Sequence, residues 1–361
     1  MKKFLSMILL LTMTVTCLYG CGSSNEGEAK QESAEEVESL NIMVWDGSWS
    51  EEVFEDFEAE TGIHVNVSFI DNTDTIISKL IEGNADYDLV DIESAYVKTF
   101  VDNELLTKLD TEKLDSRQYL IDSIAGAVGD ENMEYTTPNM APNYTCVVYN
   151  KETCPIEIKS FKDLADPALE GEVAMVNSTI SLYGMALEAC GYSADSCEES
   201  EMKEANDLLK DIKKNVKAFV GESAVSQLEN GECSVAFCWD YSTLCNDSKE
   251  NWDKFEVADL DSPNEYFTQY WGIPSSSTKT EAAQQLINFI MQPEELAKCY
   301  TEYGGIPVEK EEYLLEYLPE DYYENPAIKK AEELYDNSWK IAVNDEQISL
   351  MDTYYTELMG N

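Results

Sequence analysis

The apolar positions of the chain follow two alternating periods between residues 40 and 103. "LNIMVW", "HVNVSFI" and "YDLVDI" are short apolar or alternating runs that predict strands. Between them, "SEEVFEDFEAETG" places Val53, Phe54 and Phe57 on one helical face and ends at Gly62, and "DTIISKLIEG" and "AYVKTFVDN" also predict helices. Strands that alternate with helices are typical of a mostly parallel α/β sheet.

A second α/β block follows the first. It begins near the strand "YTCVVYNK" and continues through the helices "SLYGMALEAC" and "ESEMKEANDLLKDIKKNV" to the strand "CSVAFCW". A third run, "YFTQYWGIP" with the helices "TEAAQQLINFIMQ" and "PEELAKCYTEYG", is too short for a domain of its own. We expect it to return to the first block, and we expect the last helix, "EQISLMDTYYTELMG", to pack on one of the two blocks.

The N-terminal pattern predicts a targeting segment. Lys2 and Lys3 precede the apolar "FLSMILLLTMTVTCLYG", which has the length of a signal-peptide core. "CLYGC" resembles a bacterial lipobox, so residues 1–20 are expected to be a lipoprotein signal peptide and Cys21 the lipidated residue. The alternative is an ordinary secretory signal with a chance cysteine. The polar residues 21–39 predict a disordered tether, which would hold the folded part outside the cytoplasm by a lipid anchor only.

Length and charge narrow the class of protein. About 320 residues follow the targeting segment, which is more than one core usually serves, so two domains are expected. The formal net charge of −48 argues against nucleic acid or an anionic membrane surface as a partner. The acidity is spread along the whole chain, which indicates solubility or habitat rather than a particular ligand.

The residues that enzymes and metal sites require are scarce. The chain has one histidine, His64, at the start of a predicted strand, where an exposed or edge position is expected. It has no GxSxG, HExxH, GxxxxGK[ST] or GxGxxG motif. A carboxylate pair such as glycosidases use cannot be singled out among 72 acidic residues, so an exported hydrolase stays an alternative to a binding protein without cofactor or metal.

The cysteines do not show metal-binding spacing. Cys146, Cys233 and Cys238 lie in strand-like apolar runs and are expected to be small buried side chains, because no CxxC or Cys/His pattern is present. Cys190 and Cys197 enclose the loop that a disulfide could close most easily in an exported protein.

Aromatic residues stand at the ends of several predicted elements. Each of them alone is explained by core packing. Together they favour a binding site, because open α/β sheets bind ligands at the ends of parallel strands, and aromatic walls beside acids suit a small organic solute, particularly an ammonium. The acids Asp46, Glu93 and Asp240 are adjacent to such aromatics. The aromatics are Trp45, Trp49, Tyr96, Trp239, Tyr241, Phe267, Tyr270, Trp271 and Trp339.

From about Leu40 to its end, the chain resembles the spermidine/putrescine-binding branch of extracellular solute-binding proteins, the receptors of ABC importers. The resemblance is carried, in family order, by "FEDFEAETGIHV", "NADYDLVDIESAYV", "SFKDLADPALEGEVAM", "MALEACGY", "CSVAFCWDYS", "WGIPSSSTKTEAAQQLINFIMQPEELAKC" and "EYGGIPV". Together these motifs are specific for the family, and none of them is specific for a ligand.

The resemblance implies a periplasmic-binding-protein-like fold of type II, in which two α/β lobes joined by a hinge trap a ligand in the cleft between them. It implies a first lobe of residues 40–142 and 268–308 and a second lobe of residues 143–267 and 309–361. The expected protein is a monomer that captures a small-molecule solute and delivers it to the permease subunits of an ABC importer. A receptor that signals to a membrane sensor is the alternative.

The resemblance also implies which side chains line the cleft. The motifs place there, from the first lobe, Trp45, Asp46, Ser48, Trp49, Glu93, Ser94, Tyr96 and Gln269 and, from the second, Ser178, Ser181, Trp239, Asp240, Phe267 and Lys340.

The sequence departs from the family at several of these positions. Where polyamine receptors have carboxylates, this chain has Ser178, Ser181 and Gln269, and Lys340 adds a positive charge. A buried ammonium without a partner costs several kcal/mol, so a polyamine would need replacement acids such as Asp46, Glu93 or Asp240. The two serines at a predicted helix start favour an anionic group or act as a plain N-cap. The predicted solute is therefore a polyamine, with an amino acid, another zwitterion or another small organic solute as the alternative.

Overall fold

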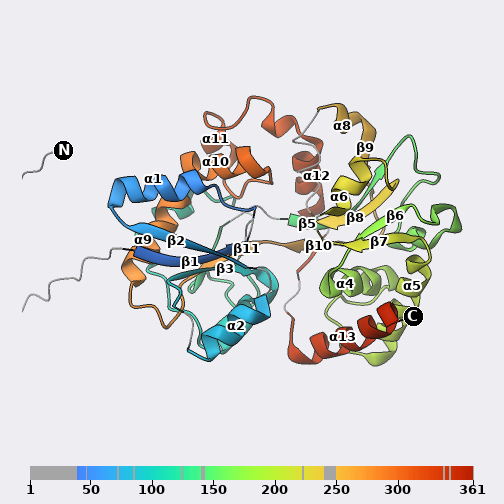
Figure 1. Ribbon diagram of the computed structural model, residues 1–361, viewed down its shortest axis with the longest axis horizontal. Helices are drawn as coiled ribbons and strands as arrows, with labels where there is room; N and C mark the ends of the chain where they lie inside the picture. The colour runs from blue at the N-terminus through green and yellow to red at the C-terminus, as the bar shows by residue number, and fades with distance from the viewer. Residues whose placement is uncertain are drawn as a thin grey trace, which may run out of the picture. The chain divides into compact units, whose positions relative to one another are not determined.

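The computed structural model describes most of the chain after the predicted tether (Figure 1). The predicted signal peptide, Cys21, Asp46 and Asp240 lie outside the described residues. No helix within the described part of the chain is long and apolar enough to cross a bilayer. The described residues are 39–45, 47–70, 73–83, 86–122, 124, 126–139, 143–221, 223–239, 249–335, 338–340 and 343–360.

The first sheet has the strand order β2-β1-β3-β11-β4. β1 pairs in parallel with β2 and β3, as the strand and helix alternation predicts, and β11 runs antiparallel to β3 and β4. The third run of the sequence therefore returns to the first sheet, and this prediction is confirmed. The strands are β1 (Ser39–Trp45), β2 (His64–Ile70), β3 (Leu89–Glu93), β4 (Thr136–Pro138) and β11 (Gln269–Gly272).

The helices next to this sheet include those that the spacing of apolar residues predicts. In α1, Val53, Phe54 and Phe57 are buried, and Gly62 ends the helix at φ 77°, where its N–H donates to the Glu58 carbonyl. A residue with a Cβ rarely adopts this left-handed conformation, which explains the glycine. The helices are α1 (Glu51–Thr61), α2 (Thr73–Ile81), α3 (Val97–Asp102), α9 (Thr280–Ile290), α10 (Pro293–Tyr303) and α11 (Glu311–Leu314).

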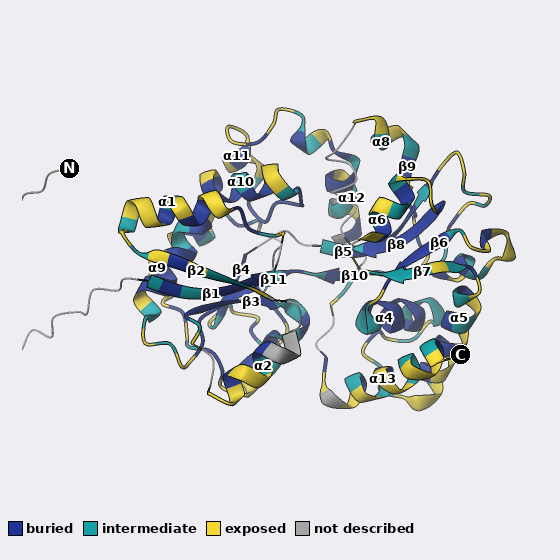
Figure 2. Cartoon of the chain, in the orientation of Figure 1, coloured by how far each residue is buried: buried dark blue, intermediate teal, exposed yellow. Residues whose placement is uncertain are grey.

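The second sheet has the strand order β12-β10-β5-β8-β6-β7, with β9 also paired to β5. Its central strands are buried on both faces, and α13 packs on α4 and α5 at its side (Figure 2). Its strands are β5 (Asn143–Asn150), β6 (Val173–Val176), β7 (Val216–Val220), β8 (Val235–Trp239), β9 (Phe255–Val257), β10 (Asn264–Phe267) and β12 (Ser338–Trp339). The helices after β5 are α4 (Thr179–Cys190), α5 (Glu199–Lys213), α6 (Ser223–Glu229), α8 (Lys249–Lys254), α12 (Pro326–Tyr335) and α13 (Asp345–Gly360).

The two sheets are connected most directly at Thr268. Phe267 ends β10 in the second sheet and Gln269 begins β11 in the first, so "YFTQYWGIP" forms two strands in two sheets rather than one segment. Two hydrogen bonds fix this crossing: the Ser94 N–H donates to the Thr268 carbonyl at 2.8 Å, and the Thr268 N–H donates to the Ser94 side-chain Oγ at 3.3 Å.

The sequence predicts that the chain returns to the second lobe at residue 309, and the packing of the later helices bears on this limit. α11 packs against α10, which accompanies the first sheet, whereas α13 packs on α5 and α4. We therefore propose that the chain enters the second lobe after α11. The remaining limits of the two lobes stay predictions.

The histidine and the strand cysteines lie where the pattern predicts. His64 is exposed on the edge strand β2, with Nδ1 2.7 Å from Glu58 Oε2. Cys146, Cys233 and Cys238 are buried. Cys190 and Cys197, which could close a short disulfide loop, are both free.

Candidate functional site

The first half of the candidate site is the end of β3. Asp91 and Glu93 are two residues apart in this strand, so both side chains point to the same face of the sheet. Burial raises the pKa of Glu93 to about 7. Glu93 is paired with Gln269 of β11, whose side-chain Oε1 is buried and has no hydrogen-bond partner.

Asp91 differs from Glu93 because its carboxylate is occupied by the protein. Asn139 Nδ2 donates to Oδ1 at 2.9 Å and Trp49 Nε1 donates to Oδ2 at 3.3 Å. Burial raises the pKa of Asp91 to about 7, although these two hydrogen bonds lower it. We infer that Asp91 holds the end of the first sheet in place and does not bind a solute.

Trp49, a predicted cleft residue, lies in the core of the first lobe. It is buried, and its ring centroid is 4.8 Å from that of Trp271. With its indole N–H on Asp91, no part of the side chain is left for a ligand, and we leave Trp49 out of the proposed site. Ser48 lies half-buried in the turn before it, which Gly47 makes possible with φ 73°.

The second half of the candidate site is centred on Glu265 of β10. Its side chain is 3% exposed, and its Oε2 has no hydrogen-bond partner. Burial raises the pKa of Glu265 to about 7; a hydrogen bond with Ser181 lowers it and the charge of Glu93 raises it further. The charge of Glu93 in the first sheet therefore acts on Glu265 in the second.

Glu265 was not among the predicted site residues. Its strand, "NEYF", is not part of a motif that carries the family resemblance, and the resemblance implied Gln269 as the cleft residue instead. The sequence did contain one feature that pointed to Glu265: it is an acidic residue within the aromatic, strand-like run "EYFTQYW". Acidic side chains are almost never fully buried unless they have a partner.

The predicted serines are linked to Glu265 through the start of α4. Ser178 is the N-cap and accepts from the Ser181 N–H at 3.2 Å, so its hydroxyl acts as the plain cap that the sequence left open. Ser181 Oγ accepts from Trp239 Nε1 at 3.1 Å. Ser181 thus connects the predicted aromatic Trp239 to the unpredicted carboxylate of Glu265.

Trp339 is a further aromatic of this half, although it was predicted only as an aromatic at an element end. It is paired with Glu265 between β12 and β10, and its Nε1 is buried without a hydrogen-bond partner. Its ring rests on α4 at Gly184, where an added Cβ would lie 2.4 Å from the ring. Gly184 is therefore required for Trp339 to lie this close to α4.

Several buried polar atoms in the strands around Glu265 and Gln269 have no hydrogen-bond partner among the described residues. Such atoms are uncommon in folded proteins, because each costs the desolvation of a donor or acceptor. Four of them belong to β5, β10, β11 and β12, and the fifth to Trp45 at the end of β1, which pairs with β3; a bound solute would satisfy them. We call this set, with Glu93, Ser181 and Trp239, the junction site. The unpartnered atoms are Trp45 Nε1, Asn143 Oδ1, Glu265 Oε2, Gln269 Oε1 and Trp339 Nε1.

The other predicted residues lie around the junction site. Tyr96 is half-buried and packs against the hydrophobic clusters on both sides of the first sheet. Phe267 is half-buried and paired with Asn143. Lys340, expected to oppose a cation, is exposed, and its ammonium lies 4.8 Å from the ring centroid of Tyr266. A cation placed over an aromatic ring is already partly compensated.

The fold and family of the chain follow from comparison with known proteins. Residues 52–330 match the family of bacterial extracellular solute-binding proteins, and the chain belongs to this family. It is a solute-binding receptor and not an enzyme, which excludes the hydrolase alternative.

Several known proteins align with most of this chain in sequence or in structure. The spermidine/putrescine-binding periplasmic protein 1 of Haemophilus influenzae is 27% identical, with 99% of each chain covered. The TpPotD lipoprotein of Treponema pallidum has a TM-score of 0.77 at 19% identity, covering 89% of this chain and 99% of that one. The Atu4243–GABA receptor has a TM-score of 0.66 at 17% identity, covering 89% and 97%. The predicted periplasmic-binding-protein-like fold is confirmed, and the fold alone does not choose the solute.

Proposed function

We propose that the chain is a lipid-anchored, extracytoplasmic receptor of an ABC importer that captures a polyamine at the junction site. The observation that carries this proposal is the pair of the half-buried Glu93 and the buried Glu265, two carboxylates from different sheets whose pKa values are both raised to about 7. Burial disfavours their charged forms, and a bound cation would favour them.

The arrangement of the pair suits an organic cation with more than one ammonium group. One carboxylate belongs to each lobe, so a polycation that contacts both is bound best when the lobes are close together. The aromatic side chains of Trp239 and Trp339 next to Glu265 offer ring faces to the same cation. The solute would thus favour a closed form, which the permease of an importer could recognise.

The two objections raised by the sequence are weaker in the structure. The acids that appeared to be missing at Ser178, Ser181 and Gln269 have a substitute in Glu265, which bonds Ser181. The positive charge of Lys340 lies over Tyr266. The names of the H. influenzae and T. pallidum relatives, one a spermidine/putrescine-binding protein and the other a lipoprotein, support the solute and the anchor.

An amino acid or another zwitterion is the second candidate, and a specific observation favours it. The buried indole N–H groups of Trp45 and Trp339 are donors without acceptors, and a solute carboxylate would satisfy them. A protein of the same fold is named as a GABA receptor.

A thermal-shift titration of the mature chain tests the solute. A ligand that binds only the folded state raises the unfolding midpoint. We expect putrescine and spermidine to raise it at micromolar concentrations, and γ-aminobutyrate and glutamate to leave it unchanged. A shift with either amino acid and none with a polyamine at millimolar concentration would replace the first candidate by the second.

Detergent phase partitioning tests the anchor. The wild-type chain, expressed with its own N-terminus, is expected in the detergent phase, because a covalently attached acyl chain partitions into the apolar interior of a micelle. The Cys21→Ala variant is expected in the aqueous phase. Equal partitioning of the two chains would contradict lipidation at Cys21.

A further inference from the structure

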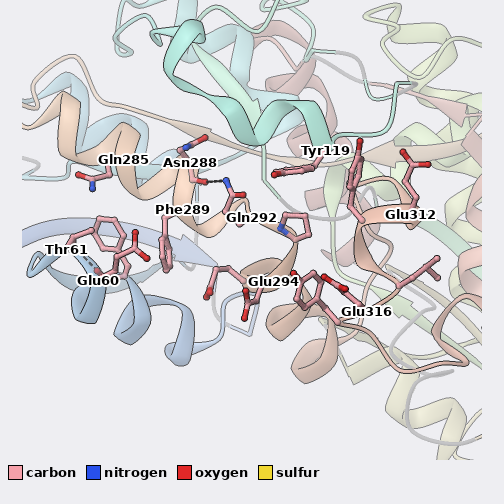
Figure 3. Close-up of a pocket in the computed structure, with 16 residues that line it drawn as sticks. Glu60, Thr61, Tyr119, Gln285, Asn288, Phe289, Gln292, Glu294, Glu312 and Glu316 are labelled. Carbon is pink, nitrogen blue, oxygen red and sulfur yellow. Dashed lines mark hydrogen bonds between the residues drawn. The ribbon is translucent and has the colours of Figure 1, made fainter.

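A pocket of about 860 Å³ lies among the helices of the first lobe, away from the junction site (Figure 3). It is lined by the end of α1, by α9 and the start of α10, by Tyr119, and by residues 312–317 in and after α11. It shares no residue with the junction site. We call it the outer pocket.

The lining of the outer pocket is acidic on several sides and contains no lysine or arginine. Glu295 is held at 2.8 Å by Lys298, which lies outside the lining. The other carboxylates make no ion pair with any residue that the structure describes, and in Figure 3 they come from α1, from α10 and from α11 with the residues directly after it. They are Glu60, Glu294, Glu312 and Glu316.

The rim of the outer pocket is apolar. Tyr313, Leu315 and Tyr317 are 36%, 60% and 40% exposed, which makes them three of the six large apolar side chains exposed in the described chain. Tyr313 also packs edge to face on Tyr119, with ring centroids 5.0 Å apart. Exposed apolar side chains gathered around a hollow indicate a surface that another protein covers.

We propose that the outer pocket docks a segment of a partner protein that carries lysine or arginine together with apolar side chains. The carboxylates complement the cationic groups, and Leu315 and the two tyrosines supply the apolar contact that a small inorganic or organic cation would not use. The site is distinct from solute capture, so either of the two proposals can fail without the other.

A defined peptide tests the proposal. The probe is a short synthetic peptide with arginine on one helical face and leucine on the other, titrated onto the mature chain by fluorescence anisotropy. Replacement of its leucines by serine is expected to weaken binding by about tenfold. The Glu60→Lys/Glu312→Lys/Glu316→Lys variant is expected to weaken it at least as much.

The high negative charge of the whole chain makes a matched control essential. Glu152→Lys/Glu170→Lys/Glu232→Lys changes the net charge equally at exposed positions of the second lobe, and it is expected to leave peptide binding within about twofold of wild type. A cooperative thermal melt must persist in both variants, which shows that they fold. Equal loss in both variants, or equal affinity for the leucine and serine peptides, would overturn the proposal.

Discussion

The junction site and the outer pocket both combine carboxylates with aromatic rings, but they differ in their contact with water. Glu265 is buried and Glu93 half-buried, and burial raises the pKa of each to about 7. Glu60, Glu312 and Glu316 of the outer pocket are exposed. An exposed carboxylate stays charged and attracts any cation weakly through solvent, whereas a buried one remains charged only with a matching partner. The difference separates a site that selects a solute from a surface that attracts a basic segment.

The largest expected effect is at Glu265. Glu265→Gln keeps the shape of the side chain but removes the charge that a solute ammonium would meet, so we expect polyamine affinity to fall by about a hundredfold. Isothermal titration calorimetry measures the loss. Glu256→Gln on the neighbouring strand β9 is the matched control, because this residue is exposed. Unchanged affinity in the Glu265 variant would mean that the solute does not reach this carboxylate.

The second largest effect is expected in the pH dependence of solute affinity, which reflects the burial of the two carboxyls. The carboxyls of Glu93 and Glu265 are protonated below pH 7, whereas aliphatic ammonium groups stay charged to about pH 10. A cation must therefore displace protons at low pH, and affinity is expected to fall by about tenfold between pH 8 and pH 6 for each titrating group. The dependence should be shallower in Glu265→Gln. A flat profile would contradict the role of the pair.

Glu309 tests whether burial of an acid by itself makes a binding site. Burial raises its pKa to about 8, although a hydrogen bond from the Tyr300 hydroxyl at 3.0 Å lowers it, and it belongs to neither region. The folded state binds this proton more tightly than the unfolded state, so stability falls as pH rises from about 4.5 to about 8. Glu309→Gln is expected to add about 1–2 kcal/mol to the free energy of unfolding at pH 8.5.

Thermal melts of both chains at pH 5 and pH 8.5 measure this difference. Solute affinity at pH 8 should be the same in the Glu309→Gln variant as in wild type. A loss of solute affinity would show that Glu309 contributes to the junction site.

The smallest expected effect is at Gly184. An alanine Cβ would lie 2.4 Å from the Trp339 ring, so the ring must shift away from α4 and from its neighbour Glu265. We expect solute affinity to fall about fivefold in Gly184→Ala, with a small loss of stability from overpacking. Gly221→Ala, which has open space around its Cβ, is the control. Equal affinity in the two variants would remove Trp339 from the junction site.

The sequence alone predicted β1, β2, β3, β5 and β8 and several of their side chains; it took β10 and β11 as one run and did not predict β4, β6, β7, β9 or β12. Periodicity placed α1 with Val53, Phe54 and Phe57 inward, and it placed Cys146 and Cys238 as buried side chains in two strands. These features follow from local spacing and from burial of one face, so they could be read along the chain. The return of β11 to the first sheet was also predicted, because the third run was too short to fold alone.

The candidate site was less predictable because its members come from distant segments. Trp49 and Glu93 both stand beside a predicted strand end, yet one packs on Trp271 in the core and the other reaches the junction site. Glu265 carried no motif, and only its position opposite Ser181 and near Glu93 distinguishes it from the other acids of the chain. Proximity of this kind is a property of the folded chain.

The sequence by itself determined the α/β class, the order of the elements that it predicted, the family resemblance and the strongly negative charge, while export stays a prediction. Local periodicity and composition act over a few residues, so they are readable without coordinates. The tertiary structure decided which acids are buried, which of them act on one another between the two sheets, and which remain exposed around the outer pocket. Burial depends on contacts between residues far apart in the chain, and it is burial that changes the chemistry of a carboxylate.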